Sequence, residues 1–135
     1  MRLTILCAVT AALVIFIVGC GGSASEEEIP LEDRVLARWH HLMERDFAGA
    51  WEFHAPGFRQ VNSRDEFVRD MSGRPVRWLE ADLESVSCDG DVCDVMVRVT
   101  YQVPGAPLGM SSMRVPTTIR ERWIRVNGSW WLAAS

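Results

Sequence analysis

The pattern of apolar and polar residues divides the chain into three parts. Residues 3–18 are almost uninterrupted apolar sequence, residues 31–73 carry apolar positions at helical spacing, and from residue 76 onward apolar and polar positions alternate. Helical spacing predicts helices with one buried stripe, whereas alternation predicts strands of a sheet with one buried face. Helices followed by strands are the element order of an α+β fold. We therefore expect one α+β domain at residues 31–135.

The helical part is expected to begin with a helix over residues 31–45. Val35, Trp39 and Leu42 recur at helical spacing and give this helix an apolar stripe. Arg38 falls away from that stripe, so we expect its side chain to lie in solvent. The stripe is the face of the helix that we expect to be buried in the core.

A second, short helix is expected between Asp46, a typical N-cap residue, and the Pro-Gly pair at residues 56–57. Phe47 and His54 fall on its apolar face at positions i and i+7, so the His54 imidazole is expected to be buried. Residues 58–62 are then expected to form a brief extended piece between the second helix and the next one.

Ser63 and Glu66 stand at the spacing of a capping box, which predicts the start of a third helix. The alternating part predicts four strands, at residues 77–87, 93–103, 115–126 and 129–134. The Asn-Gly pair at 127–128 is typical of a type I′ turn between the last two strands. In the first hairpin, the apolar faces oppose one another only if a β-bulge lies between Asp82 and Ser87.

The apolar segment at the N-terminus is typical of an export signal. It follows a positive charge at Arg2 and is shorter than the roughly 20 residues that a membrane-spanning helix needs. It ends at Ile17-Val18-Gly19-Cys20, a run that resembles the lipobox of bacterial lipoproteins. That resemblance implies a signal peptide at residues 1–19, cleavage before Cys20, and a membrane anchor of lipid and fatty acyl chains such as palmitate on Cys20.

Residues 20–30 are interpreted as the lipidated Cys and a flexible tether, because Gly and Ser are followed by a run of Glu. We expect the domain in the cell envelope, held to a membrane by its lipid. Gly21 follows Cys20 in place of the Asp that retains enteric lipoproteins in the inner membrane, which favours the periplasmic face of the outer membrane. Two other interpretations stay open: cleavage after Ser25, which would release the protein, and an uncut segment that serves as the anchor.

Cys88 and Cys93 flank the predicted two-residue turn of the first hairpin, at residues 90–91. That turn makes the two cysteines directly opposed across the strands, which suits a disulfide bond in an oxidising compartment. The same spacing could serve as half of a zinc site or as a redox switch. No second cysteine pair lies outside the export segment, so a structural disulfide is the favoured interpretation.

Composition and charge narrow the possible functions. A hydrophobic content of 48% and six tryptophans indicate a packed globule. The net charge is −4, and the arginines are interleaved with acidic residues instead of forming the basic stripe of a nucleic-acid-binding protein. No segment carries a nucleotide, metal or other cofactor motif, so we expect no cofactor and no nucleic-acid partner.

Three segments, residues 46–59, 63–67 and 121–132, resemble the nuclear transport factor 2-like superfamily. The resemblance covers about residues 31–135 and implies a cone, in which a bent antiparallel sheet wraps helices and often leaves an apolar pocket at its open end. That superfamily includes isomerases, dehydratases and cyclases as well as non-enzymatic binding modules. No local pattern matches the catalytic residues of its enzymes, so no catalytic role is carried over to this chain.

The weak catalytic candidates are His54, Glu121 and Tyr101. His54 could act as an acid or base because an imidazole titrates near neutrality, although a buried histidine is more often a structural residue with a hydrogen bond. Glu121 shares strand parity with Trp123, which turns an acid inward. A pocket is one explanation for such an acid, and pairing with an arginine is the more frequent one.

Two metal sites are conceivable and neither is favoured. His40, His41 and His54 diverge along the predicted helices, so they would meet only by an accident of the fold. Met110 and Met113 could offer thioethers to Cu(I), although methionines in such a loop usually cover the core.

The sequence favours an envelope-anchored domain that is not catalytic and that binds a small apolar ligand or an envelope protein. The alternative is a pocket enzyme of the lyase or isomerase type that uses His54 with a nearby carboxylate. A cavity that contains His54 together with Glu121, Tyr101 or an aspartate is the feature that would keep the enzyme interpretation in play.

Overall fold

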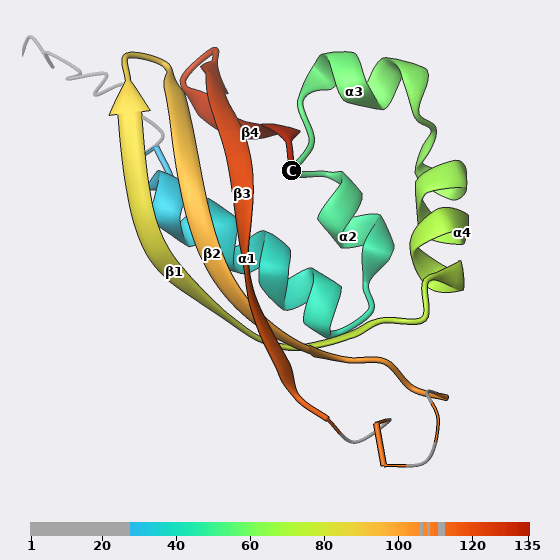
Figure 1. Ribbon diagram of the computed structural model, residues 1–135. Helices are drawn as coiled ribbons and strands as arrows, with labels where there is room; N and C mark the ends of the chain where they lie inside the picture. The colour runs from blue at the N-terminus through green and yellow to red at the C-terminus, as the bar shows by residue number, and fades with distance from the viewer. Residues whose placement is uncertain (1–27, 106, 108, 111–112) are drawn as a thin grey trace, which may run out of the picture.

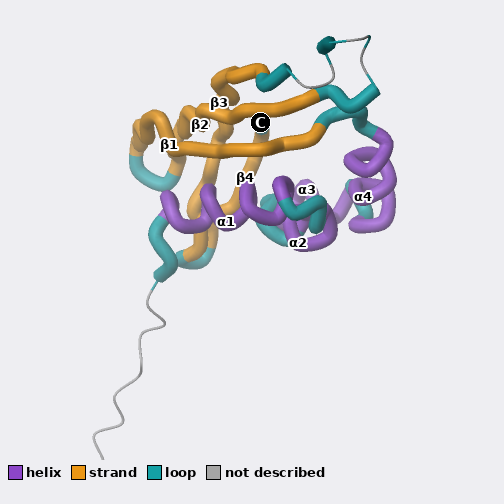
Figure 2. Tube along the Cα trace, turned by 90° about the horizontal axis from the view of Figure 1, so that it is seen from below, coloured by secondary structure: helices purple, strands orange, loops and turns teal. Residues whose placement is uncertain are grey.

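The computed structural model of this protein describes residues 28–105, 107, 109–110 and 113–135. In these residues the elements are α1 (Leu31–Met43), α2 (Phe47–Trp51), α3 (Pro56–Val61), α4 (Arg64–Gly73), β1 (Arg77–Asp89), β2 (Val92–Gln102), β3 (Val115–Val126) and β4 (Ser129–Ala134). The strands form one antiparallel sheet in the order β1-β2-β3-β4, and the helices lie on one face of it (Figures 1 and 2). The α+β prediction, with helices packed in a curved antiparallel sheet, is confirmed.

The predicted signal peptide, Cys20 and the tether up to residue 27 lie outside the described residues. Within the part of the chain that the structure covers, no helix is long and apolar enough to cross a membrane. Helix α1 begins at Leu31, directly after Pro30.

The core lies between α1 and the inner face of the sheet. Val95, Val97 and Val99, alternate residues of β2, are fully buried and cluster with Trp39 of α1 and Trp123 of β3. Burying a valine of this kind contributes roughly 1.5–3 kcal/mol. The alternating pattern of β2 therefore places its valines where the stripe of α1 can cover them.

The opposite face of the sheet is covered by charged side chains. Arg98 of β2 contacts Glu84 of β1 at 2.6 Å, and Asp94 of β2 contacts Arg120 and Arg122 of β3 at 2.6 and 3.2 Å. Such solvent-exposed pairs contribute little to the stability of the fold, because water and salt screen their charges. This charged layer explains why helices cover only one face of the sheet.

The first hairpin contains the predicted irregularity and a second one. The register shifts between Leu83 and Ser85, inside the predicted interval, so that Leu83 opposes Val97. A further shift between Trp78 and Glu80 was not predicted. Each shift gives β1 one residue more than β2, which bends and twists the strand and adds to the curvature seen in Figure 1.

Two expectations for residues 46–62 are wrong. The second helix ends at Trp51 because the following backbone pairs with β4: Leu132 N–H donates to Phe53 O and Ala55 N–H donates to Leu132 O, both at 2.8 Å. The piece predicted to be extended is helix α3, which Pro56 begins instead of ending a helix. Proline is tolerated there because its fixed φ suits the first helical position and its missing N–H has no helical partner.

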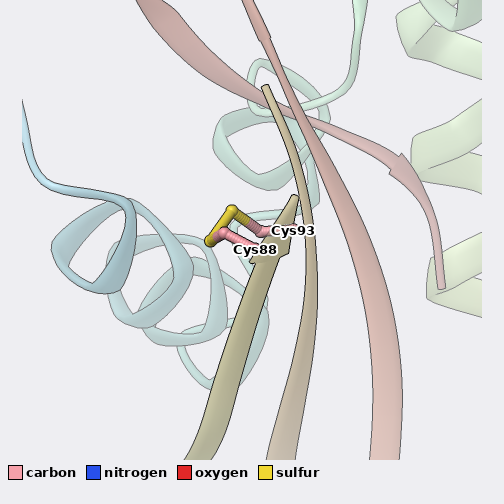
Figure 3. The surroundings of a disulfide bond; sticks show 2 residues. All are labelled: Cys88 and Cys93. Carbon is pink, nitrogen blue, oxygen red and sulfur yellow. A yellow bond between two sulfur atoms is a disulfide. The ribbon is translucent and has the colours of Figure 1, made fainter. Parts of the chain in front are cut away.

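A disulfide bond joins Cys88 and Cys93 at the end of the first hairpin (Figure 3). The two residues oppose one another in the β1–β2 register, with Cα atoms 4.0 Å apart. Gly90, in the turn between them, has a φ of 58°, a conformation that glycine adopts without strain. Cys93 is fully buried and belongs to the core cluster, so the disulfide bond links the tip of the first hairpin to the core.

Candidate functional site

A pocket of about 740 Å³ lies where α3 and α4 meet the rest of the domain. His54 and Arg38 line it, together with Phe58 of α3 and with Phe67 and Met71 of α4. Charged side chains of α4 also border it. The pocket therefore combines one aromatic and apolar wall with a larger number of polar and charged side chains, so it can contact both an apolar and a polar part of a small molecule.

His54 is held in place by the backbone pairing that ends α2. Its neighbours Phe53 and Ala55 exchange hydrogen bonds with Leu132 of β4, and this bridge fixes the direction of the His54 side chain. The imidazole stacks on the Phe58 ring at 4.1 Å between centroids and meets the edge of Phe67 at 5.2 Å. His54 is thus buried, as predicted, although the strand pairing and not a helical stripe buries it.

The imidazole of His54 is neutral at neutral pH. Burial, which is the largest cause, and the positive charges of Arg38 and Arg59 together lower the pKa of His54 to about 4. Its Nε2 atom is buried and has no hydrogen-bond partner among the described residues. The site therefore contains a neutral ring with one unsatisfied polar atom.

Arg38 and Glu121 form a buried ion pair beneath the pocket. Nη1 of Arg38 donates to Oε1 of Glu121 at 2.6 Å, and Nε1 of Trp123 donates to the other carboxylate oxygen at 2.9 Å. Arg38 is 5% exposed and Glu121 is fully buried. Burial lowers the pKa of Arg38, and the charge of Glu121 and the hydrogen bond to it oppose that effect. Glu121 therefore neutralises and orients the Arg38 guanidinium, and it does not itself line the pocket.

The position of Arg38 is a correction to the sequence analysis, which placed its side chain in solvent. Arg38 stands three residues after Val35 and one before Trp39, at the flank of the apolar stripe, and its aliphatic stem can cross that flank to reach the sheet. The signal that could have found it is Glu121. An acid on the inward face of a strand needs a cation, because an unpaired buried charge is very costly.

The mouth of the pocket carries opposite charges on α4. Asp70 and Arg74 pair at 2.6 Å, and Glu66 is occupied by the capping box with Ser63. The capping box lowers the pKa of Glu66. The pocket thus contains His54 and an aspartate, as the enzyme interpretation requires, but no hydrogen bond among the described residues joins the two.

The other candidates lie elsewhere. Tyr101 is half-buried, with its ring 5.7 Å from that of Trp78, and it does not line the pocket. His41 contacts Asp46, with Nδ1 and Oδ2 2.8 Å apart, at the junction of α1 and α2. Met110 is an exposed side chain of the loop before β3.

The metal candidates remain separate as well. Met113 is exposed, as is Met110, and residues 111–112 between them lie outside the described residues. Within residues 28–135 as far as they are described, no three His, Cys, Asp or Glu side chains stand close enough together to hold a metal ion. His54 therefore meets Arg38 and two phenylalanines instead of the other histidines.

Solved structures similar to this chain include two proteins that contain a SEC-C motif. One, from Rhodopseudomonas palustris, is 18% identical with a TM-score of 0.59, and the match covers 76% of this chain and 74% of that one. The other, from Psychrobacter arcticus, is 9% identical with a TM-score of 0.58, and the match covers 77% of this chain and 60% of that one. At these identities the similarity shows a shared fold.

A further similar structure is a putative dehydratase from the nuclear transport factor 2-like family of Streptomyces avermitilis. It is 17% identical with a TM-score of 0.47, and the match covers 73% of this chain and 86% of that one. No protein-family model and no curated protein sequence matches this chain.

Proposed function

We propose that this protein is an envelope lipoprotein whose domain binds a small, mainly apolar molecule in the pocket at His54. The observation that carries this proposal is the pocket itself: it is large enough for a small organic molecule, and Phe58, Phe67 and Met71 line it beside the buried His54 and Arg38. Its volume lies within the range of about 300–1,000 Å³ that is typical of small-molecule sites, and its apolar wall stands beside polar and charged side chains.

The polar atoms beside the pocket indicate how a ligand would be oriented in it. Nε2 of His54 and Nε of Arg38 are buried without a partner among the described residues. A buried polar atom without a partner costs roughly 1–3 kcal/mol, so a ligand whose polar end reaches either atom would relieve that penalty. We therefore favour a molecule with an aromatic or aliphatic body and one polar end.

We favour binding over catalysis because of the state of His54. A general base works best when its pKa lies near the operating pH, and the pKa of His54 is lowered to about 4 by burial and by nearby arginines. A catalytic histidine is also usually oriented by an acid, and His54 has no carboxylate partner among the described residues. The lyase or isomerase alternative rests on Asp70 at the mouth of the same pocket.

The pocket can be tested by filling it. Met71→Trp would place a large ring in the pocket, and Met96→Trp makes the same change on the charged outer face of the sheet. Each protein would be purified from the envelope in mild detergent, and its bound small molecules identified by mass spectrometry. A molecule retained by the wild type and Met96→Trp but lost from Met71→Trp supports the proposal. Equal retention by all three, or none by the wild type, contradicts it.

The anchor requires its own test. Ile17-Val18-Gly19-Cys20 supports lipid attachment at Cys20, and Gly21 supports the periplasmic face of the outer membrane as the location. Cys20→Ser should abolish fatty-acid labelling and leave an unprocessed precursor. Processing of the Cys20→Ser variant as in the wild type would instead support cleavage after Ser25 and a released protein.

A further inference from the structure

A second cluster of arginine and aromatic side chains lies outside the pocket. The guanidinium carbons of Arg34 and Arg59 each lie 5.0 Å from the centre of the Trp131 ring. Arg34 also lies 5.0 Å from the Phe53 ring, and Arg59 lies 5.4 Å from the Trp51 ring. Two positively charged groups thus contact the same tryptophan ring of β4 and lie near each other.

The two arginines have more hydrogen-bonding capacity than the cluster uses. Arg34 has no carboxylate partner among the described residues, and the Nε atoms of Arg34 and Arg59 are both buried without an acceptor. Arg59 has one acid, Glu52, at 3.1 Å. Burial and the nearby charge of Arg59 both lower the pKa of Arg34. A bound anion would relieve this repulsion and accept hydrogen bonds from the terminal N–H groups of the Arg34 guanidinium.

The cluster lies where the tether joins the domain. Arg34 stands in the first turn of α1, and Glu28, the first described residue, pairs with Arg125 of the β3–β4 hairpin. Trp131 belongs to that same hairpin. The chain between Cys20 and Glu28 has a typical reach of only roughly 15 Å, so an anchor at Cys20 would hold the cluster close to the lipid headgroups.

We propose that Arg34, Arg59 and Trp131 form a binding site for the phosphate of an anionic phospholipid, which docks the domain onto the membrane that holds its anchor. Arginine binds phosphate through paired N–H groups, and tryptophan is enriched at membrane interfaces. This site turns the end of the domain at the tether toward the membrane. The proposal rests on the lipid anchor proposed above, but not on the pocket.

The test uses the mature lipoprotein in vesicles of phosphatidylcholine alone and of phosphatidylcholine mixed with phosphatidylglycerol, at low salt. Hydrogen exchange would be followed at the amides of α1, α3 and β4, with β1 as the internal reference. The wild type should exchange more slowly at α1, α3 and β4 when phosphatidylglycerol is present. The double variant Arg34→Gln, Arg59→Gln should lose this difference, with a docked population reduced roughly tenfold.

The matched control is the double variant Arg98→Gln, Arg120→Gln, which removes the same charge from the outer face of the sheet. It should keep the phosphatidylglycerol effect. The pair Arg34→Lys, Arg59→Lys keeps the charge and should retain part of the effect, and melting temperatures check that all variants are folded. Loss of the effect in the control pair, or no effect of phosphatidylglycerol on the wild type, would overturn the proposal.

Two further arms separate the sources of an effect. Inorganic phosphate would be added to the wild type in phosphatidylcholine vesicles; slower exchange with phosphate but not with phosphatidylglycerol would identify a soluble ligand and overturn membrane docking. The intact mass of the protein reports the lipid on Cys20 independently. If the lipid is absent, the anchor fails, and sedimentation of the unlipidated protein with phosphatidylglycerol vesicles, compared between the wild type and Arg34→Gln, Arg59→Gln, decides the site by itself.

Discussion

The half of the domain formed by α1, β2 and β3 differs from the arm formed by α3 and α4 in how completely its side chains are buried. In the first half, Val35, Val97 and Trp123 are fully buried in one cluster. In the arm, no residue of α3 or α4 is buried, although Phe67 and Met71 contact that cluster. The pocket lies against the arm. The comparison teaches that the stability of the fold and the site for a ligand are located in different regions.

Besides the packing of Phe67, Val68 and Met71 against the core, the arm is held by polar contacts that are local in sequence. The capping box of Ser63 and Glu66 begins α4, and Nε1 of Trp51 donates to the backbone oxygen of Asn62 at 3.0 Å. Regions with few buried apolar contacts open at low free energy, which suits a segment that must admit a ligand. Four changes test whether the two regions differ in energy as they do in burial.

The largest effect is expected at Glu121, beneath the pocket but inside the packed half. Glu121→Ala leaves the buried guanidinium of Arg38 without its carboxylate and Nε1 of Trp123 without its acceptor. Leaving one partner of a buried pair uncompensated costs about 3–5 kcal/mol of unfolding free energy. Urea denaturation of the variant measures it. Glu84→Ala, which breaks an exposed pair with Arg98, is the control and should lower the free energy of unfolding far less.

A matched pair of valines compares the two regions directly. Val97→Ala removes methyl groups from a fully buried site on β2 and should cost about 2–3 kcal/mol. Val68→Ala makes the same change in α4, where the side chain is only half-buried, and should cost about 1 kcal/mol or less. Both losses would be measured from the midpoints of urea denaturation, provided that the variants unfold with the same dependence of free energy on urea concentration. Equal losses at the two positions would contradict the division into a packed half and a loose arm.

The disulfide at the end of the packed half should have a moderate effect. The loop that Cys88 and Cys93 close is short, so their replacement by serine should cost about 2 kcal/mol. Thermal unfolding of the double variant measures the loss. Mass spectrometry of the wild type provides the companion measurement: native protein that takes up two alkyl groups without a reductant would show that the bond does not form in the envelope.

The smallest effect concerns the pH dependence that His54 imparts at the pocket. Its pKa is about 4 in the folded protein against an ordinary 6.5, so between these values the unfolded chain binds a proton that the native state does not. Stability should fall as the pH decreases from about 6.5 toward 4, by on the order of 1–2 kcal/mol once solvent screening near the pocket is taken into account.

The measurement is urea denaturation at about pH 7 and about pH 5, for the wild type and for His54→Gln, which does not titrate in this range. The difference in stability between the two pH values should be smaller in His54→Gln. Ion pairs on the sheet contribute equally to both proteins and cancel from the comparison. An identical pH dependence in the two proteins would show that the His54 imidazole is not buried as described.

Patterns local in sequence predicted most of the fold. The capping box of Ser63 and Glu66, the turn at residues 127–128 and the alternation along β2 each appear where the sequence places them, because each depends on residues a few positions apart. Pro56 was misinterpreted because only its local neighbours were considered. A proline ends one helix or begins the next, and the neighbouring residues do not distinguish the two cases.

The sequence by itself determined that helices precede strands, although it missed α3, and it determined the inward faces of α1 and β2 and the opposed placement of Cys88 and Cys93. Only the tertiary structure decided that Arg38 turns inward to Glu121 and that β4 ends α2 and positions His54. The physical reason is separation along the chain. Helical and strand periodicity act over a few residues, whereas an ion pair across 83 positions and a bridge to Leu132 form only when the sheet closes over the helices.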